Sequence, residues 1–169
     1  MKKDENPSVC KRLALTGVLL MVVSGALAGP VAAPMKTVSL CVQGVQKTVR
    51  AEVAASEAQR NLGLMNRREL APYAGMLFQF AEPPPVGVGF YMYRTLIPLD
   101  VAFMNKSGRI VAIRTMVPCA SSVPSRCPVY RPGVGFASAL EVNAGFFKRH
   151  DVQKGDSIFP VEQEGCKDH

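Results

Sequence analysis

The sequence predicts an α+β fold, in the form of a small β-rich barrel or rolled, mostly antiparallel sheet of about eight short strands with one or two short helices. Short apolar runs recur along the chain, and several alternate with polar residues as β-strands do. Short turns with Gly or Pro separate most of these runs, which favours antiparallel neighbours. Helical segments are few, whereas a parallel α/β sheet needs a helix between successive strands. The expected strands are 37–42, 46–53, 76–80, 88–93, 99–105, 109–116, 137–142 and 157–161.

Two short helices complete this prediction. Ser56 and Gln59 form an S-x-x-Q capping box, in which each side chain accepts a hydrogen bond from a backbone N–H at the start of a helix. Apolar residues spaced by four and then three positions continue that helix to about Met65. Asn143 is suited to cap a second helix that runs to about His150.

A basic start followed by an apolar run predicts a signal peptide over residues 1–28. The run at 13–28 ends in Ala-Leu-Ala, a small-residue cleavage signal, and it is short for a membrane span. An uncleaved anchor is the alternative, and only in that case do we expect contact with a membrane. Both interpretations place the domain in the periplasm or outside the cell. We expect a flexible lead-in at 29–36, one globular domain at 37–162 and a C-terminal tail at 163–169.

Four cysteines remain once the leader with Cys10 is removed, and an even number in an oxidising compartment predicts two disulfides. Of the three possible pairings we favour Cys119–Cys127 and Cys41–Cys166. The first closes a proline-rich loop, and the second ties the first strand to the tail. Free buried thiols are the alternative. No metal is expected, because the cysteines lack the paired C-x-x-C spacing of a zinc site.

The predicted mature chain is moderately basic. The full sequence holds 20 basic and 13 acidic residues. Four of the basic and two of the acidic residues lie in the leader, so the net charge of the mature chain is 16 minus 11, or +5. This charge permits attraction to acidic glycans or to a lipid surface. Nucleic acid is not expected as a partner, because the basic residues form no cluster. No cofactor is expected either, since the sequence has no P-loop or Rossmann motif. The serine-hydrolase elbow and the zinc-protease motif are also absent.

Six segments carry a family resemblance when they are taken in order. They are G-L-M-N-R at 63–67, G-M-L-F at 75–78, F-Y-M-Y-R-T-L-I-P-L-D at 90–100, P-C with C-P-x-Y at 118–130, L-E-V-N-A-G at 140–145 and G-D at 155–156. Together they resemble the domain-of-unknown-function family 192, a group of small prokaryotic proteins, over about residues 48–160. The resemblance implies a small β-rich α+β fold and frequent export, and it implies no established activity. The family usually has F-W-M-K-N at the third segment, where this chain has Tyr91 for Trp and Tyr93-Arg94 for Lys-Asn.

Asp100 is the first candidate for a functional carboxylate. It shares one side of its predicted strand with Ala102 and Met104, and a carboxylate among apolar neighbours must find partners or stay protonated. The functional interpretation is a group that binds a ligand or transfers protons. The structural interpretation is a hydrogen bond to Thr95 or to the backbone of the bend at 95–98.

Glu141 raises the same question. If its strand lies near Asp100, the two carboxylates and Arg94 meet in one polar pocket that is suited to general acid/base work, as in glycan cleavage. The alternative is a buried ion pair with Arg67 or Arg114.

The irregular segment 117–135 is the candidate recognition loop, because long loops without regular structure in compact domains are often functional. It presents Arg126, Tyr130 and Arg131 near one another, and Tyr and Arg are common at recognition surfaces. The tyrosines of the 88–93 strand can add an exposed aromatic face that suits sugars. The alternative is a rigid loop without a binding role.

We therefore expect an exported, non-enzymatic module that binds a small molecule, a glycan or an envelope protein. A glycan-type hydrolase with Asp100 and Glu141 as paired carboxylates is the alternative, and an interaction module without any pocket is a third possibility. Asn143 is interpreted as a helix cap, and it is also counted among the expected binding residues. The expected binding residues are Arg94, Thr95, Asp100, Arg126, Tyr130, Arg131, Glu141 and Asn143.

Overall fold

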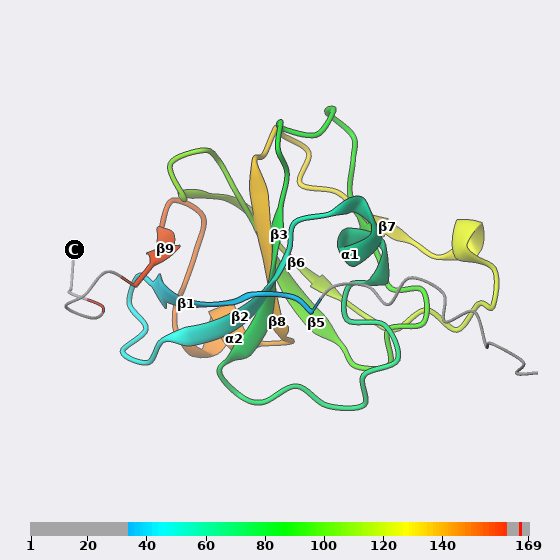
Figure 1. The fold of residues 1–169 in the computed structure, drawn as a ribbon, viewed down its shortest axis with the longest axis horizontal. Coiled ribbons are helices and arrows are strands. Elements are labelled where there is room, and N and C mark those ends of the chain that lie inside the picture. The colour runs from blue at the N-terminus through cyan, green and yellow to red at the C-terminus, as the bar shows by residue number, and fades with distance from the viewer. Residues whose placement is uncertain (1–33, 162–165, 167–169) are drawn as a thin grey trace, which may run out of the picture. The chain divides into compact units, whose positions relative to one another are not determined.

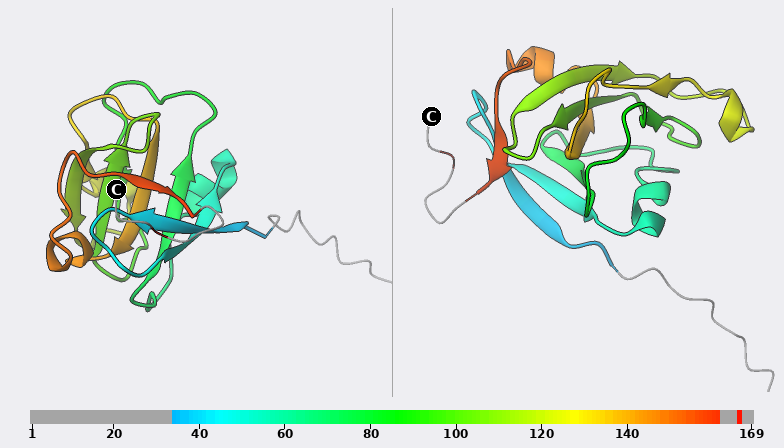
Figure 2. Two further views of the ribbon diagram at one scale, coloured as in Figure 1. Left: turned by 90° about the vertical axis from the view of Figure 1, so that its left-hand side faces the viewer. Right: turned by 90° about the horizontal axis from the view of Figure 1, so that it is seen from above.

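The structure is a computed structural model that describes residues 34–161 and Cys166. The predicted signal peptide at 1–28 lies outside the described residues, as do most of the lead-in at 29–36 and of the tail at 163–169. The described part is built around a seven-stranded sheet that curls into a half-barrel (Figure 1, Figure 2), which confirms the predicted rolled α+β fold. In their order across this main sheet, the strands are β6 (Ile110–Met116), β5 (Leu99–Met104), β8 (Ser138–Asn143), β3 (Ala74–Gln79), β2 (Val49–Ala54), β1 (Thr37–Val42) and β9 (Ile158–Pro160).

Neighbouring strands of the main sheet are antiparallel except for β2 and β3, which are parallel. The helix α1 (Glu57–Leu62) lies in the connection between these two strands, as a parallel pair requires. It begins at the predicted capping box, where Ser56 Oγ accepts from the Gln59 backbone N–H at 3.2 Å and Gln59 Oε1 accepts from the Ser56 N–H at 3.0 Å. The helix ends earlier than predicted because Gly63 adopts a φ of 49° directly after it.

The two edges of the main sheet meet at one corner, which explains its curl. Arg109, just before β6, forms an isolated bridge with Ser157, just before β9. Backbone hydrogen bonds run from Ile110 N to Asp156 O at 2.8 Å and from Ile158 N to Gly108 O at 2.9 Å. Gly108 is required here, because it has a φ of 78° and any Cβ would collide with the carbonyl oxygen of Ile158.

Apolar side chains cover both faces of the main sheet. One apolar cluster includes both Ile110 on β6 and Ile158 on β9, which are the two edge strands of the sheet. Side chains from opposite edges can meet only inside the curl, so this cluster marks the inner face. The helix α2 (Phe146–Arg149) closes one end of this cluster with Phe146 and Phe147. The outer face of the sheet carries a second, largely aromatic cluster, whose sheet members include Met76, Phe78, Val101, Phe103 and Ala139.

A second, two-stranded sheet packs on the outer face and forms what we call the arm, comprising residues 86–96 and 117–134. Strand β4 (Phe90–Tyr91) pairs antiparallel with β7 (Val129–Tyr130), and a 3-10 helix, η1 (Pro124–Arg126), precedes β7 (yellow in Figure 1). The sequence predicted a longer strand at 88–93 and no strand within 117–135. Among the described residues, no helix is long and apolar enough to span a membrane.

Candidate functional site

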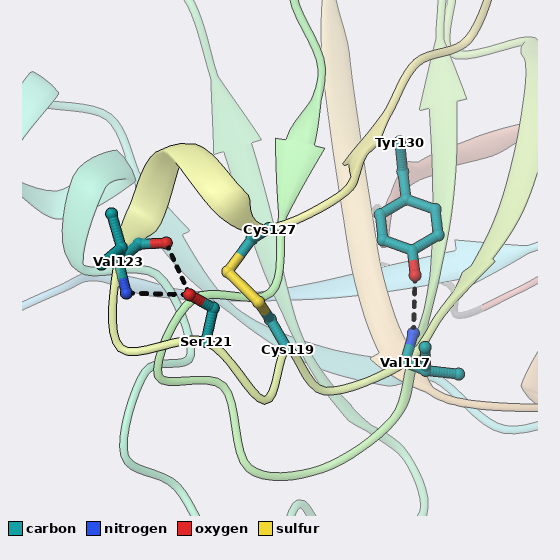
Figure 3. Close-up of a disulfide and its surroundings, with 6 residues drawn as sticks. All are labelled: Val117, Cys119, Ser121, Val123, Cys127 and Tyr130. Atoms are coloured by element: carbon teal, nitrogen blue, oxygen red, sulfur yellow. Dashed lines mark hydrogen bonds between the residues drawn. A yellow bond between two sulfur atoms is a disulfide. The ribbon is translucent and has the colours of Figure 1, made fainter.

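Two disulfides are present, and they are the two pairs favoured from the sequence. Cys41 on β1 is bonded to Cys166, with a Cα–Cα distance of 5.3 Å. Cys119 is bonded to Cys127, with a Cα–Cα distance of 5.6 Å, and this bond braces the arm (Figure 3). Within the described part of the chain, no three His, Cys, Asp or Glu side chains are grouped so that they could hold a metal ion.

Asp100 is buried on the inner face and has a hydrogen-bond partner. Its side chain is 2% exposed, and Oδ1 accepts a hydrogen bond of 2.8 Å from the hydroxyl of Thr115 on the neighbouring strand β6. The predicted partner Thr95 is therefore wrong. Thr95 is buried in the turn after β4, where its backbone N–H donates to the carbonyl oxygen of Met92 at 3.2 Å.

Glu141 points to the opposite face of the sheet from Asp100. Asp100 lies opposite Val142 in the ladder between β5 and β8, and Glu141 lies opposite Val101. Because consecutive residues of a strand alternate between faces, a difference of one position places the two carboxyl groups on different faces. The predicted pocket that joins Asp100, Glu141 and Arg94 is wrong, and the paired-carboxylate arrangement of a glycan hydrolase is not formed.

The carboxyl group of Glu141 lies in an apolar environment. The residue is 5% exposed, and its neighbours on the adjacent strands are Met76 and Val101. Burial raises the pKa of Glu141 from its ordinary value of 4.5 to about 8, because an apolar environment disfavours the charged form. At neutral pH the group is therefore mostly a neutral acid, and it carries a proton that it can donate.

Neither arginine proposed as a partner reaches Glu141, so the predicted ion pair is wrong. Arg67 instead binds Glu52 on β2 through two hydrogen bonds of 2.6 and 2.8 Å. These bonds lower the pKa of Glu52 and raise that of Arg67. Arg114 donates to the backbone carbonyls of Ile113, Arg131 and Pro132, which ties β6 to the arm.

Asn143 holds a loop in place and does not cap α2. Its Nδ2 donates to the carbonyl oxygens of Leu70 at 2.9 Å and Ala71 at 3.1 Å. The residue at the start of α2 is Gly145, which has a φ of 77° and no side chain to accept a hydrogen bond. The predicted cap is wrong because Asn143 still belongs to β8, and the chain turns into the helix two residues later.

The arm carries aromatic and basic side chains, together with Val129, on the side that faces away from the main sheet. Tyr91 lies opposite Val129 in the small ladder, and its ring stacks on that of Tyr93 with a centroid distance of 6.5 Å and an interplanar angle of 24°. The guanidinium of Arg94 lies 5.1 Å from the centroid of the Tyr93 ring. Arg131 follows Val129 by two positions and therefore shares its side of the strand. We call these five residues the arm face.

Two further contacts hold the strands that carry the arm face in place. The Nε of Arg131 donates to the carbonyl oxygen of Gly87 at 2.8 Å, which ties the two segments of the arm together. Tyr130 points to the other side, where it packs with the aromatic cluster, and its hydroxyl accepts from the Val117 backbone N–H at 3.2 Å (Figure 3). Tyr130 is thus a brace of the arm, whereas Arg126 is exposed on η1.

Exposed apolar side chains concentrate on the arm. Of the eight large apolar side chains that are exposed in the described part of the chain, all except Leu62 lie within residues 86–96 and 117–134. The arm holds Arg94, Arg126 and Arg131 but no Asp or Glu in its sequence. The exposed apolar residues of the arm are Val86, Tyr91, Leu96, Val117, Val123, Val129 and Val134.

The sequence pointed to part of the arm face and missed the rest. The alternation of Tyr91 and Tyr93 with apolar neighbours indicated an exposed aromatic face, and Arg131 was included in the recognition loop. Val129 was missed because β7 has only two residues and follows a proline, so no strand pattern could be recognised there.

Comparison with known proteins agrees with this architecture. The model of the DUF192 family, described as an uncharacterized ACR, matches residues 38–159. The chain belongs to the DUF192 family. No curated protein sequence matches the chain.

Two solved structures are similar to this DUF192 chain. One is a putative transcription regulator from Sinorhizobium meliloti, with 33% identity, a TM-score of 0.63, and coverage of 78% of this chain and 98% of that one. The other is a protein of unknown function from Novosphingobium aromaticivorans, with 28% identity, a TM-score of 0.63, and coverage of 85% of this chain and 99% of that one.

Proposed function

We propose that this DUF192 protein is an exported, non-enzymatic domain that binds an acidic polysaccharide of the cell envelope through the arm face. One observation carries the proposal: exposed apolar side chains and arginines gather on the arm, in a segment that contains no acidic residue. Exposed apolar patches of this kind mark interaction sites on soluble domains.

The chemistry of the arm face favours an anionic partner with ring-shaped units. The rings of Tyr91 and Tyr93 offer a broad apolar surface on which a sugar ring can lie, and they lose little conformational freedom on binding. Arg94 and Arg131 provide planar guanidinium groups, which match the geometry of a carboxylate. An open surface of this kind suits a segment of a polymer better than an enclosed small molecule.

Binding is favoured over hydrolysis by the placement of the acidic groups. The arm face holds no carboxylate and no histidine, so it lacks the side chains that usually transfer protons in glycan cleavage. Asp100 and Glu141 are both buried in the main sheet, and they lie on opposite faces of it.

Export is supported by the two disulfides. Structural disulfides persist in oxidising compartments and are rare in the cytosol. The bonds Cys41–Cys166 and Cys119–Cys127 join cysteines whose Cα atoms lie 5.3 and 5.6 Å apart in the fold. Together with the leader predicted from the sequence, they favour a periplasmic or secreted location.

Binding of the purified protein to polygalacturonate, measured against neutral dextran, tests the proposal. We expect Tyr91→Ala and Arg131→Gln each to weaken binding to polygalacturonate about tenfold, the size of effect that an interface anchor has. Leu62→Ala and Arg50→Gln are the matched controls, since both residues are exposed outside the arm, and they should bind as the wild type does. Binding should also weaken as salt is raised. Equal binding to neutral dextran, or equal losses in the controls, would contradict the proposal.

A further inference from the structure

The curled main sheet has one closed and one open end. The helix α2 follows β8 and covers the end at which β8 finishes, with Phe146 and Phe147 buried inside. At the other end β3 and β5 finish and β8 begins, and here a cavity of about 370 Å³ opens beside the turn at 105–108. We call it the mouth cavity.

The floor of the mouth cavity is apolar and belongs to the inner core. Leu40, Leu77, Met104 and Ile158 line it, and each of them is at most 7% exposed. A ligand that enters the cavity therefore meets the interior of the rolled sheet directly. Mouths of β-barrels are frequent sites of small-molecule binding, and ligand cavities have volumes from about 300 to 1,000 Å³. The volume of this cavity lies within that range.

The rim of the mouth cavity carries unused polar groups. Lys106 lies in the turn beside the cavity, and no described residue forms an ion pair with its ammonium group. The amide of Gln79 and the hydroxyl of Ser138 also line the cavity, and no hydrogen bond from another described side chain occupies them. None of the described residues that line the cavity is acidic. The rim thus offers one positive charge and two neutral hydrogen-bonding groups above an apolar floor.

The walls of the mouth cavity are fixed by the fold. Asn105 Oδ1 accepts from the Ser107 N–H, the Ser107 hydroxyl and the Arg109 N–H, at 2.8 to 3.0 Å, so the turn that carries Lys106 is held rigidly. The bridge between Arg109 and Ser157 closes the sheet beside it. A neighbouring cavity of about 390 Å³ shares Gln79, Ala137 and Ser138 with the mouth cavity.

From this arrangement we propose that the mouth cavity binds an amphipathic carboxylate, a medium-chain fatty acid or a compound of the same chemistry. Its hydrocarbon tail packs on the four floor residues, and its carboxylate accepts charge-assisted hydrogen bonds from Lys106 and a hydrogen bond from Ser138. A cation would be repelled by Lys106, and a fully apolar ligand would leave the polar rim without partners. This site shares no residue with the arm face and does not depend on the proposed polysaccharide binding.

Calorimetric titration of the purified full chain with octanoate tests this inference. We expect a single site, and we expect 1-octanol, which has the same chain length but no charge, to bind at least tenfold more weakly. Lys106→Gln should weaken octanoate binding about tenfold and bring its affinity to that of the alcohol, whereas Lys148→Gln, on α2 at the closed end, should leave it unchanged. Gln79→Trp should block the opening and abolish binding. Both Lys106 and Gln79 are exposed, so these variants keep the fold, which thermal unfolding verifies.

Three outcomes would overturn the inference. They are the absence of octanoate binding at millimolar concentration, equal affinity for octanoate and 1-octanol, and unchanged octanoate binding by Lys106→Gln. The variant Tyr91→Ala separates this site from the arm face, because it should bind polygalacturonate about tenfold more weakly while it binds octanoate as the wild type does.

Discussion

The main sheet and the arm are held together by different means, although each is fastened by one disulfide. In the main sheet, apolar side chains pack on both faces, and every residue of β5 is buried. In the arm, the two paired strands have two residues each, and only one of their faces packs on the domain. The comparison shows that packing stabilises the main sheet, whereas a short covalent link and a few hydrogen bonds shape an exposed surface on the arm.

The largest expected effect comes from the disulfide that fastens the main sheet. Cys41 and Cys166 are 125 residues apart in the sequence, and Cys119 and Cys127 are eight apart. In the chain-entropy model the longer loop stabilises the native state by about 5 kcal/mol and the shorter by about 2.5 kcal/mol. In urea unfolding, we expect the double variant Cys41→Ser with Cys166→Ser to lose more free energy of unfolding than the double variant Cys119→Ser with Cys127→Ser. Equal losses in these two variants would contradict the difference between the main sheet and the arm.

The next effect concerns Glu141 and the pH dependence of stability. In the unfolded chain this carboxyl group ionises near pH 4.5, whereas in the folded protein its pKa is about 8. Between these values the folded state binds one proton more than the unfolded state, so the free energy of unfolding falls as the pH rises, by roughly 1.4 kcal/mol per pH unit for this group alone. The contribution is greatest below pH 4.5 and levels off above pH 8.

The variant Glu141→Gln isolates this contribution, because glutamine has nearly the same shape and does not titrate. We expect its stability relative to the wild type to rise steadily in urea unfolding between pH 5 and pH 8. A constant difference over this range would show that the carboxyl group is solvated or paired in the folded state, and that the outer face of the main sheet is less dry than described.

The local features of the fold could be predicted from sequence, and most of the long-range ones could not. The capping box at Ser56 and the strand at 37–42 follow from patterns within short stretches. The cysteine count and the compartment predicted two disulfides, and the pairing found is the one favoured among three. The parallel pairing of β2 with β3 was not predicted from the sequence, although α1 lies in the long connection 55–73 that joins the two strands.

The candidate site shows the same division. The burial of Asp100 and Glu141 follows from their apolar neighbours. Whether the two carboxyl groups share a face depends on the register between β5 and β8, because a shift of one residue moves a side chain to the opposite face. The position of Asn143 at the end of β8, and not at the start of α2, likewise depends on where the strand ends. The arm face depends on a two-residue strand, which is too short to leave a pattern.

The central claim is that packing stabilises the main sheet while the disulfide-braced arm forms the binding surface. Its most direct test is to measure the stability and binding of the double variant Cys119→Ser with Cys127→Ser. We expect its free energy of unfolding to fall by about 2.5 kcal/mol, with the main sheet still folded, because only the short loop gains freedom. Its affinity for polygalacturonate should fall at least tenfold, while its affinity for octanoate at the mouth cavity stays unchanged. Polygalacturonate binding that matches the wild type in this variant would contradict the claim that the braced arm forms the binding surface.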